Sequence, residues 1–355
     1  MEKLRWGIVG TADIARQNWR AMYDSGNSIV TAVASRSLER SEQFIQTCQA
    51  ENSFEVQPKA YGNYKQLIDA PDIDAVYIPL PTGLRKEWIL RAAEAGKHVL
   101  CEKPCGINLN DVQEMVETCK KNQVQFMDGV MFMHNPRLQR IRKVLDDSRS
   151  IGTIKRISSM FSFCAPEDYQ RSNIRLHSDL EPMGCLGDLG WYNIRFSLWA
   201  MKWQVPYAVS GRILSQRGSN TSPAPTPTDF SGELIFNDDT SAGFSCSFLT
   251  GSEQWSIISG TIGSLSISDF VHPVNIHEPS FDVNNTEMRV KCCNCTGEHT
   301  KSRAQAQDTL MIRNFVNQIR SGQLNDEWPM MAITTQRVLD ACFESAKNDG
   351  KLILL

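Results

Sequence analysis

A charged tripeptide, Glu102-Lys103-Pro104, directly follows a short apolar run over residues 98–101. A lysine that is partly desolvated and held near another positive charge should have a lowered pKa. It could then exchange a proton with a substrate hydroxyl or hold a hydrogen bond to it. Proline fixes the turn and removes a backbone donor. The same tripeptide could also be an ordinary polar strand end, so its interpretation depends on the elements around it.

A second pair of reactive side chains lies in the stretch GCLGDLGWY, which begins at Gly184. Asp188 and Tyr192 are four residues apart, so on a helix they share one face. An acid and a phenol on one face can share the proton transfer that carbonyl reduction needs. The alternative, which is common, is an N-cap aspartate and a core tyrosine.

The first third of the chain alternates apolar runs with helical patterns. Strands separated by helices of about 10–15 residues are typical of βαβ units and a parallel sheet, with both faces covered. Ligands of such sheets lie outside the carboxyl ends of the strands, so the fourth strand would carry Glu102 and Lys103 to that crevice. The strands expected are Leu4–Val9, Ile29–Ser35, Ala75–Leu80, His98–Cys101 and Gln125–Asp128, and the helices are Asp13–Asp24, Leu38–Cys48, Leu84–Ala95 and Asp111–Asn122.

The pattern changes after about residue 129. A helix over Pro136–Leu145 is followed by strand-like runs that lack intervening helices, except for a helix over Gly187–Ala200. Such runs predict an antiparallel or mixed sheet. The fold expected is α/β plus α+β, with a doubly wound domain over residues 1–128 and a second domain over residues 129–355. The runs are Ile154–Phe163, Tyr207–Leu214, Phe230–Phe236, Ser241–Phe248, Trp255–Gly260 and Ser264–Ile267, before final helices at Gln305–Arg320 and Ile333–Asn348.

Composition excludes several classes of protein. The 355 residues carry 37 basic and 40 acidic side chains, a net charge of −3, which points to neither nucleic acid nor an anionic membrane surface as a partner. The amino terminus has no apolar signal core, and no apolar run approaches the roughly 18 residues of a membrane helix. Eleven cysteines form no paired framework, so we expect a cytoplasmic protein with reduced thiols.

The first strand ends in a turn that suits a dinucleotide. Its register is Gly10-x-Ala12-x-x-Ala15, with alanine where the usual fingerprint has its second glycine. Glycine lets the backbone approach a pyrophosphate, and the start of the following helix offers unpaired N–H groups. This motif alone is weak, because any tight strand-to-helix turn can resemble it.

The second strand ends at Ser35-Arg36-Ser37, where a site for NAD usually has an acidic residue. A hydroxyl and a guanidinium suit a phosphate instead, so NADP(H) is favoured over NAD(H). Arg40 could add a second positive charge. The alternative is a solvated start of the next helix.

Together these motifs resemble the Gfo/Idh/MocA oxidoreductase family, whose namesakes are glucose–fructose oxidoreductase and inositol dehydrogenase. The resemblance runs nearly end to end and is greatest to the subgroup with dihydrodiol dehydrogenase, xylose dehydrogenase and plant-type members. The order of the motifs is more specific than any one of them. They are GIVGTADIA, SRS, VYIPLPT, EKP, MDGVMFMHNP, NIRL and GCLGDLGWY.

The resemblance implies roles for individual residues. Lys103 would be the catalytic lysine, Tyr192 the proton donor or acceptor, and Asp188 the group that orients or polarises. His134 and Arg175 would line the substrate pocket. The cofactor would be held by Gly10, Thr11, Ala12, Asp13 and Ile14 at the pyrophosphate, Ser35 and Arg36 at the 2′-phosphate, Pro79, Leu80 and Thr82 beside the two nucleoside halves, and Glu102 at the nicotinamide ribose.

Three departures from the family pattern put the substrate in doubt. Ala12 replaces a common glycine. Arg85 stands where many members have histidine, and would add positive charge near the cofactor. Met183 replaces a second glycine before Gly184, and its bulk could narrow the pocket entrance.

A cysteine cluster raises the possibility of zinc. Cys292, Cys293 and Cys295 precede His299, but the spacing supplies three ligands and no evident fourth. Structural zinc has four ligands, so we expect no metal and interpret the cluster as reduced thiols in an insertion loop.

The sequence therefore predicts an NADP-dependent dehydrogenase or carbonyl reductase. Its substrate would be a small molecule such as a sugar, polyol, diol or glycoside-like alcohol. Two alternatives remain open: a sensor or scaffold that binds NADP without turnover, and a redox-neutral enzyme with retained cofactor and a transient keto intermediate. The family resemblance also implies a homodimer formed through the second domain's sheet.

Overall fold

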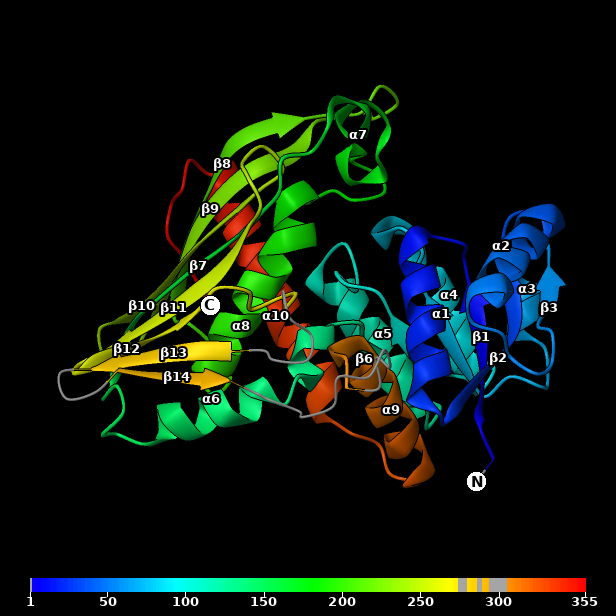
Figure 1. The fold of residues 1–355 in the computed structure, drawn as a ribbon. Helices are drawn as coiled ribbons and strands as arrows, with labels where there is room; N and C mark the ends of the chain where they lie inside the picture. Colours follow the sequence, from blue (N-terminus) through cyan, green and yellow to red (C-terminus); the bar gives the residue numbers. More distant parts are fainter. Residues whose placement is uncertain (1, 274–279, 286–288, 294–304) are drawn as a thin grey trace. The chain divides into compact units, whose positions relative to one another are not determined.

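The structure is a computed structural model that describes residues 2–273, 280–285, 289–293 and 305–355. The chain forms two compact units (Figure 1). The first unit comprises Met1–Gly106, Asn110–Asn135 and Thr300–Ala332, and the second comprises Ile107–Leu109, Pro136–His299 and Ile333–Leu355.

The first unit is built on a six-stranded parallel sheet with the order β3-β2-β1-β4-β5-β6. This is the doubly wound order, and it confirms the predicted parallel sheet. The strands are β1 (Leu4–Val9), β2 (Ser28–Ala34), β3 (Lys59–Tyr61), β4 (Ala75–Ile78), β5 (His98–Cys101) and β6 (Phe126–Asp128). The helices are α1 (Asp13–Ser25), α2 (Leu38–Glu51), α3 (Tyr64–Ile68), α4 (Thr82–Glu94), α5 (Leu109–Lys121), the 3₁₀ helix η1 (Met131–His134) and α9 (Gln307–Arg320).

The division of the chain differs from the two contiguous domains expected at residue 128. Helix α9, near the carboxyl terminus, belongs to the first unit. The Trp6 ring lies 5.4 Å from that of Phe315, and the Asn27 side chain donates to the Arg313 carbonyl at 3.2 Å. Helix α9 belongs to the first unit because its apolar face, which includes the fully buried Phe315 and Val316, packs against residues of that unit.

The second unit contains a nine-stranded sheet with the order β14-β13-β12-β11-β7-β10-β9-β8-β15. Only the β7–β10 pair is parallel among the pairings described. Its strands are β7 (Ile154–Ser162), β8 (Ala208–Arg217), β9 (Thr226–Phe236), β10 (Thr240–Ser247), β11 (Glu253–Gly260), β12 (Gly263–Ile267), β13 (Ser280–Asn285), β14 (Arg289–Cys293) and β15 (Ile353–Leu354). The helices are α6 (Arg137–Asp146), α7 (Glu167–Ser172), the 3₁₀ helix η2 (Ile174–Leu176), the π-helix η3 (Leu186–Gly190), α8 (Trp191–Ala200) and α10 (Glu327–Lys347), which begins in the first unit.

Helices α8 and α10 pack on one face of this sheet (Figure 1). The Asn193 side chain of α8 donates to Ser159 Oγ at 2.9 Å, and the Gly211 N–H donates to Ser345 Oγ of α10 at 2.9 Å. Gly211 permits this contact because a Cβ there would lie 2.3 Å from the Cys342 carbonyl oxygen. The other face of the sheet lacks these two helices.

The predicted helix over Gly187–Ala200 is divided in two. Its first turn is the π-helix η3, and regular α-helix begins only at Trp191. Gly190 allows the wide turn to pack closely, since a Cβ there would lie 2.8 Å from Leu186 Cδ1 and 3.3 Å from Cys246 Sγ. Among the described residues, no helix is both long and apolar enough to cross a membrane.

Candidate functional site

The turn between β1 and α1 has a backbone that a ligand can approach closely. Gly10 has φ +116°, which favours glycine, and a Cβ there would lie 3.0 Å from Leu80 Cδ2. Ala12 is the N-cap of α1 and provides no side-chain cap, so the first-turn N–H groups of Asp13 and Ile14 are open to an anion. These features fit the pyrophosphate of a dinucleotide.

Ser35 and Arg36, both predicted to bind the 2′-phosphate, differ in burial and contacts in the turn after β2. The buried Ser35 hydroxyl donates to the Ser37 carbonyl at 2.7 Å and so orders the turn. Arg36 and Arg40 are exposed. Burial raises the pKa of the Tyr64 phenol, and these two guanidinium groups offset part of that rise. The result is an exposed positive patch at the position where a 2′-phosphate would bind.

Three further predicted cofactor residues follow β4. Pro79 and Leu80 lie beside Gly10, since a Cβ on Gly10 would be 3.8 Å from Pro79 Cγ. Thr82 is buried at the first position of α4. The structure therefore brings Pro79 and Leu80 together with the β1 turn at the carboxyl edge of the sheet.

Glu102 is held by a buried chain of hydrogen bonds. The Tyr77 hydroxyl donates to Glu102 Oε1 at 2.7 Å, and the Asn18 amide donates to the Tyr77 oxygen at 2.8 Å. Burial and the neighbouring carboxylate raise the pKa of Tyr77, so the phenol stays protonated and keeps donating. A Cβ on Gly129 would lie 3.1 Å from Glu102 Oε1, so glycine there leaves room for the carboxylate.

Lys103 is buried, with 7% of its surface exposed, and follows the carboxyl end of β5. Arg85 contacts the turn that carries Lys103 and is 2% exposed. Its Nε donates to the Leu80 carbonyl at 2.6 Å, and its Nη1 donates to the carbonyls of Glu102, at 2.7 Å, and Pro104. Arg85 was expected to add charge near the cofactor, but its described hydrogen bonds all go to these backbone carbonyls.

In the second unit, Arg175 forms ion pairs with two carboxylates. Its Nη2 lies 3.2 Å from Asp188 Oδ1, and its Nη1 lies 3.0 Å from Glu181 Oε1. One guanidinium and two carboxylates give this cluster a formal charge of −1. Asp188 is carried by the π-helix η3, a form of helix that is frequent at functional sites.

Tyr192 is the second residue of the next helix, α8, and is 5% exposed. Its ring packs edge-on against Phe161, with ring centroids 5.5 Å apart. A second tyrosine, Tyr169, was not anticipated: burial raises its pKa, and the Asp188 carboxylate adds to the rise. Neither Tyr169 nor Glu181 belongs to a recognisable motif: Tyr169 lies in the short helix α7, and Glu181 lies in the loop between η2 and η3.

The three predicted substrate residues are divided between the units: His134 belongs to the first, and Arg175 and Tyr192 belong to the second. His134 ends η1 in the first unit, where its Nδ1 lies 3.1 Å from Asn314 Nδ2 and its ring lies 6.0 Å from that of Trp328. Met183, expected near the pocket entrance, is buried at 7% exposure.

The side chains of the cysteine cluster lie outside the described part of the structure. Cys295 and His299 lie outside the described residues, as do the side chains of Cys292 and Cys293. Within the part of the chain that the structure describes, no group of three or more histidine, cysteine or acidic side chains could hold a metal ion.

Comparison with known proteins places the chain among oxidoreductases. Residues 4–130 match the model "Oxidoreductase family, NAD-binding Rossmann fold", and residues 138–266 match the model "GFO/IDH/MocA C-terminal domain". The trans-1,2-dihydrobenzene-1,2-diol dehydrogenase of Mus musculus is 31% identical over 278 residues, 77% of each chain.

Two further matches extend over nearly the whole chain. D-xylose 1-dehydrogenase (NADP(+)) 2 of Haloferax volcanii is 25% identical over 353 residues, 99% of this chain and 100% of its own. The solved structure of a 3-ketoreductase from Actinomadura kijaniata, in complex with NADP and TDP-benzene, has a TM-score of 0.82 at 22% identity and covers 97% and 98% of the two chains. With the doubly wound sheet and its crevice residues, these matches show that the chain belongs to the Gfo/Idh/MocA family of oxidoreductases.

Proposed function

We propose that this oxidoreductase transfers a hydride between NADP(H) and the carbinol or carbonyl carbon of a sugar, polyol, diol or similar neutral alcohol. One observation carries the proposal: the carboxyl edge of the first sheet gathers the Gly10 turn, Arg36, Glu102 and Lys103. The enzyme class follows from the family and from relatives that are named dehydrogenases.

Arg36 supports the preference for NADP over NAD. It is exposed at the carboxyl end of β2, where a guanidinium suits a phosphate better than a ribose hydroxyl. The turn has no acidic residue between Ser35 and Leu38 to take that hydroxyl. The xylose dehydrogenase relative is named for NADP(+), which agrees with this assignment.

Bound NADP would supply the hydride acceptor or donor, and the chain's residues would bind the cofactor and handle the proton. Glu102, fixed by Tyr77, would accept a hydrogen bond from the nicotinamide ribose. Lys103 and Tyr192 would exchange the proton of the substrate hydroxyl. Asp188, fixed by Arg175, would orient the substrate hydroxyl or the phenol.

The charges around Asp188 support a neutral substrate. Arg175 is paired with both Asp188 and Glu181, and the three side chains sum to −1. Free substrate hydroxyls can donate to these carboxylates. D-Xylose and a dihydrobenzene diol, named for the two dehydrogenase relatives, are both uncharged, whereas the 3-ketoreductase structure holds the nucleotide derivative TDP-benzene.

The experiment begins with NADPH and NADH titrated side by side, and continues with turnover on uncharged aldoses, polyols and diols. A nucleotide-linked sugar serves as the anionic comparison. We expect tight NADPH binding and turnover confined to the uncharged compounds. NADPH binding without turnover would favour a sensor, and cofactor retained through purification would favour the redox-neutral scheme.

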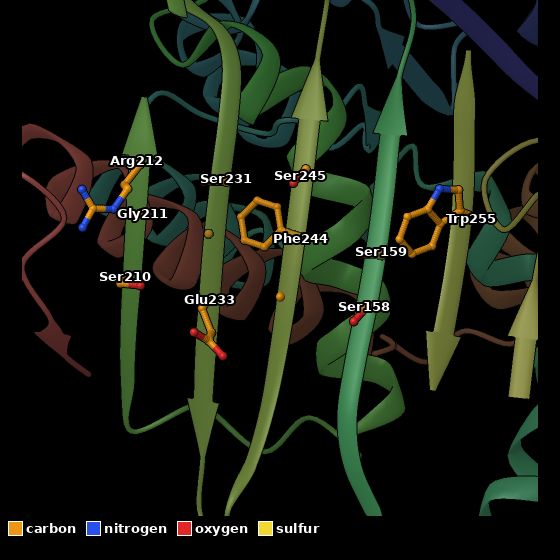
Figure 2. Close-up of a pocket in the computed structure, with 12 residues that line it drawn as sticks. Ser158, Ser159, Ser210, Gly211, Arg212, Ser231, Glu233, Phe244, Ser245 and Trp255 are labelled. Atoms are coloured by element: carbon orange, nitrogen blue, oxygen red, sulfur yellow. The ribbon is translucent and has the colours of Figure 1, made fainter. Parts of the chain in front are cut away.

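We also propose that two copies of the chain pair through the outer face of the second sheet, as the family resemblance implies. The outer face is the one opposite helices α8 and α10. This face carries a shallow cavity of about 450 Å³ (Figure 2). Leu214 and Ile257 are exposed beside it, at 60% and 39%. The cavity is lined by Ser158, Ser159, Ser210, Gly211, Arg212, Ser231, Gly232, Glu233, Gly243, Phe244, Ser245 and Trp255.

A charge at the centre of this face should separate the copies. Ile257→Asp is expected to convert the dimer to a monomer, because pairing would then bury an unpaired carboxylate. Ile262→Asp is the matched control: Ile262 is similarly exposed, at 43%, but lies in the turn between β11 and β12. Light scattering coupled to gel filtration measures the mass. A wild-type monomer, or a dimer unaffected by Ile257→Asp, would exclude this face.

A further inference from the structure

Arg85 occupies an unusual place for a cation. It lies in the first turn of α4, where the helix dipole disfavours positive charge, and it is almost fully buried. Among the described residues, no carboxylate lies within ion-pair distance of its guanidinium. Its burial is compensated instead by three backbone carbonyls. Such an arrangement suits a residue whose task is to hold backbone.

The three carbonyls belong to the carboxyl ends of two neighbouring strands. Leu80 follows β4, whereas Glu102 and Pro104 follow β5. A guanidinium has five N–H donors in a rigid planar fork, so one side chain can bind all three carbonyls in one geometry. Arg85 therefore joins the two strand ends at the edge where the cofactor residues gather.

Lys103 is the residue between the two bonded carbonyls of the β5 turn. Its amine lies at the end of a four-carbon stem, so the backbone of the turn sets the origin from which the amine must reach the substrate. The Glu102 side chain is fixed separately, through Tyr77 and Asn18. Arg85 thus acts on the main chain on both sides of Lys103 and not on the neighbouring carboxylate.

We propose that Arg85 is a positioning residue for Lys103: it holds the Glu102–Pro104 turn so that the lysine amine meets the substrate hydroxyl. The inference rests on the proposed role of Lys103. Arg85 itself contacts neither substrate nor cofactor in this scheme. Its removal should therefore affect the chemical step more than the binding of NADPH.

The test compares Arg85→Met and Arg85→Lys with Arg91→Met. Arg91 is on the same helix, but its side chain is 45% exposed, pairs with Glu87 and stacks on Trp88. Arg85→Met should lower kcat by about 100-fold, the scale expected when a catalytic group is misplaced by about 1 Å. The Kd for NADPH should change by less than about threefold, because the lost interaction serves the transition state.

Arg85→Lys should recover about tenfold of that loss, because an ammonium can bind some of the carbonyls but lacks the planar fork. Arg91→Met should keep wild-type kcat. If Arg85→Met does not fold, Arg85→Lys alone tests the inference. Its kcat should then fall by more than its affinity for NADPH. A wild-type kcat in either folded Arg85 variant would overturn the inference, as would an equal loss in kcat and in NADPH affinity.

The outcome is separable from the proposed function. An inactive Lys103→Met with a fully active Arg85→Met would contradict only the positioning role. A fully active Lys103→Met would contradict the function proposed for Lys103 itself.

Discussion

Lys103→Met is expected to lower kcat by about 10³-fold, within the range that general acid–base groups contribute, while NADPH still binds. Methionine replaces the apolar stem of the buried side chain but removes the amine that would exchange the hydroxyl proton. The Glu102–Pro104 turn should persist, since Arg85 holds it through backbone carbonyls. Steady-state turnover and NADPH fluorescence titration on the same preparation measure the two effects.

Lys97→Met is the matched control, because Lys97 is a second buried lysine just before the same strand, β5. Its ammonium donates to the carbonyls of Ala70 and Ile73 at 2.9 and 2.8 Å. Its loss should reduce the free energy of unfolding by about 1–3 kcal/mol and leave kcat nearly unchanged. If Lys103→Met kept full activity, or if both variants lost activity alike, Lys103 would not be the proton-transfer residue.

Tyr192→Phe is expected to lower kcat by about 10²-fold, with NADPH affinity preserved. The substitution removes only the hydroxyl, and the ring can still pack edge-on against Phe161. The loss should be smaller than that of Lys103→Met if the lysine can still transfer the proton alone. Turnover across the pH range, with thermal unfolding as the check on folding, measures it.

Tyr169→Phe provides the comparison, because the Asp188 carboxylate contributes to the raised pKa of the Tyr169 phenol. Its ring packs on Phe163 and Phe248, at 5.7 Å from each. We expect this variant to keep nearly full activity. If Tyr169→Phe were the inactive variant and Tyr192→Phe the active one, the proton role would belong to Tyr169.

Five of the six strands of the first sheet were predicted, all but the three-residue β3, because their signals are local. Short apolar strands alternate with helices, and the Gly10 turn and the Glu102-Lys103-Pro104 turn follow their own strands directly. Parallel topology then brings every strand's carboxyl end to one edge. Gly10, Leu80 and Glu102 could therefore be assigned to that edge without coordinates.

The hydrogen-bond and ion-pair partners of the charged side chains could not be predicted from the sequence. Arg85 has the charge expected of a phosphate ligand, yet its donors point to backbone carbonyls whose positions only the folded turn defines. Arg175 pairs with Glu181 and Asp188 through a loop that has no periodicity. The return of α9 to the first unit depends on packing between residues more than 300 positions apart, such as Trp6 and Phe315.

The central claim is an NADP-dependent crevice at the edge of the first sheet, and a fluorescence titration of the purified protein with NADPH and NADH tests it most directly. The account predicts tight NADPH binding and weak NADH binding, with the difference largely removed by Arg36→Ala. Such a result would support the Gly10 turn and Arg36 together. Binding of neither nucleotide would contradict the account, and equal binding of both would contradict the role of Arg36.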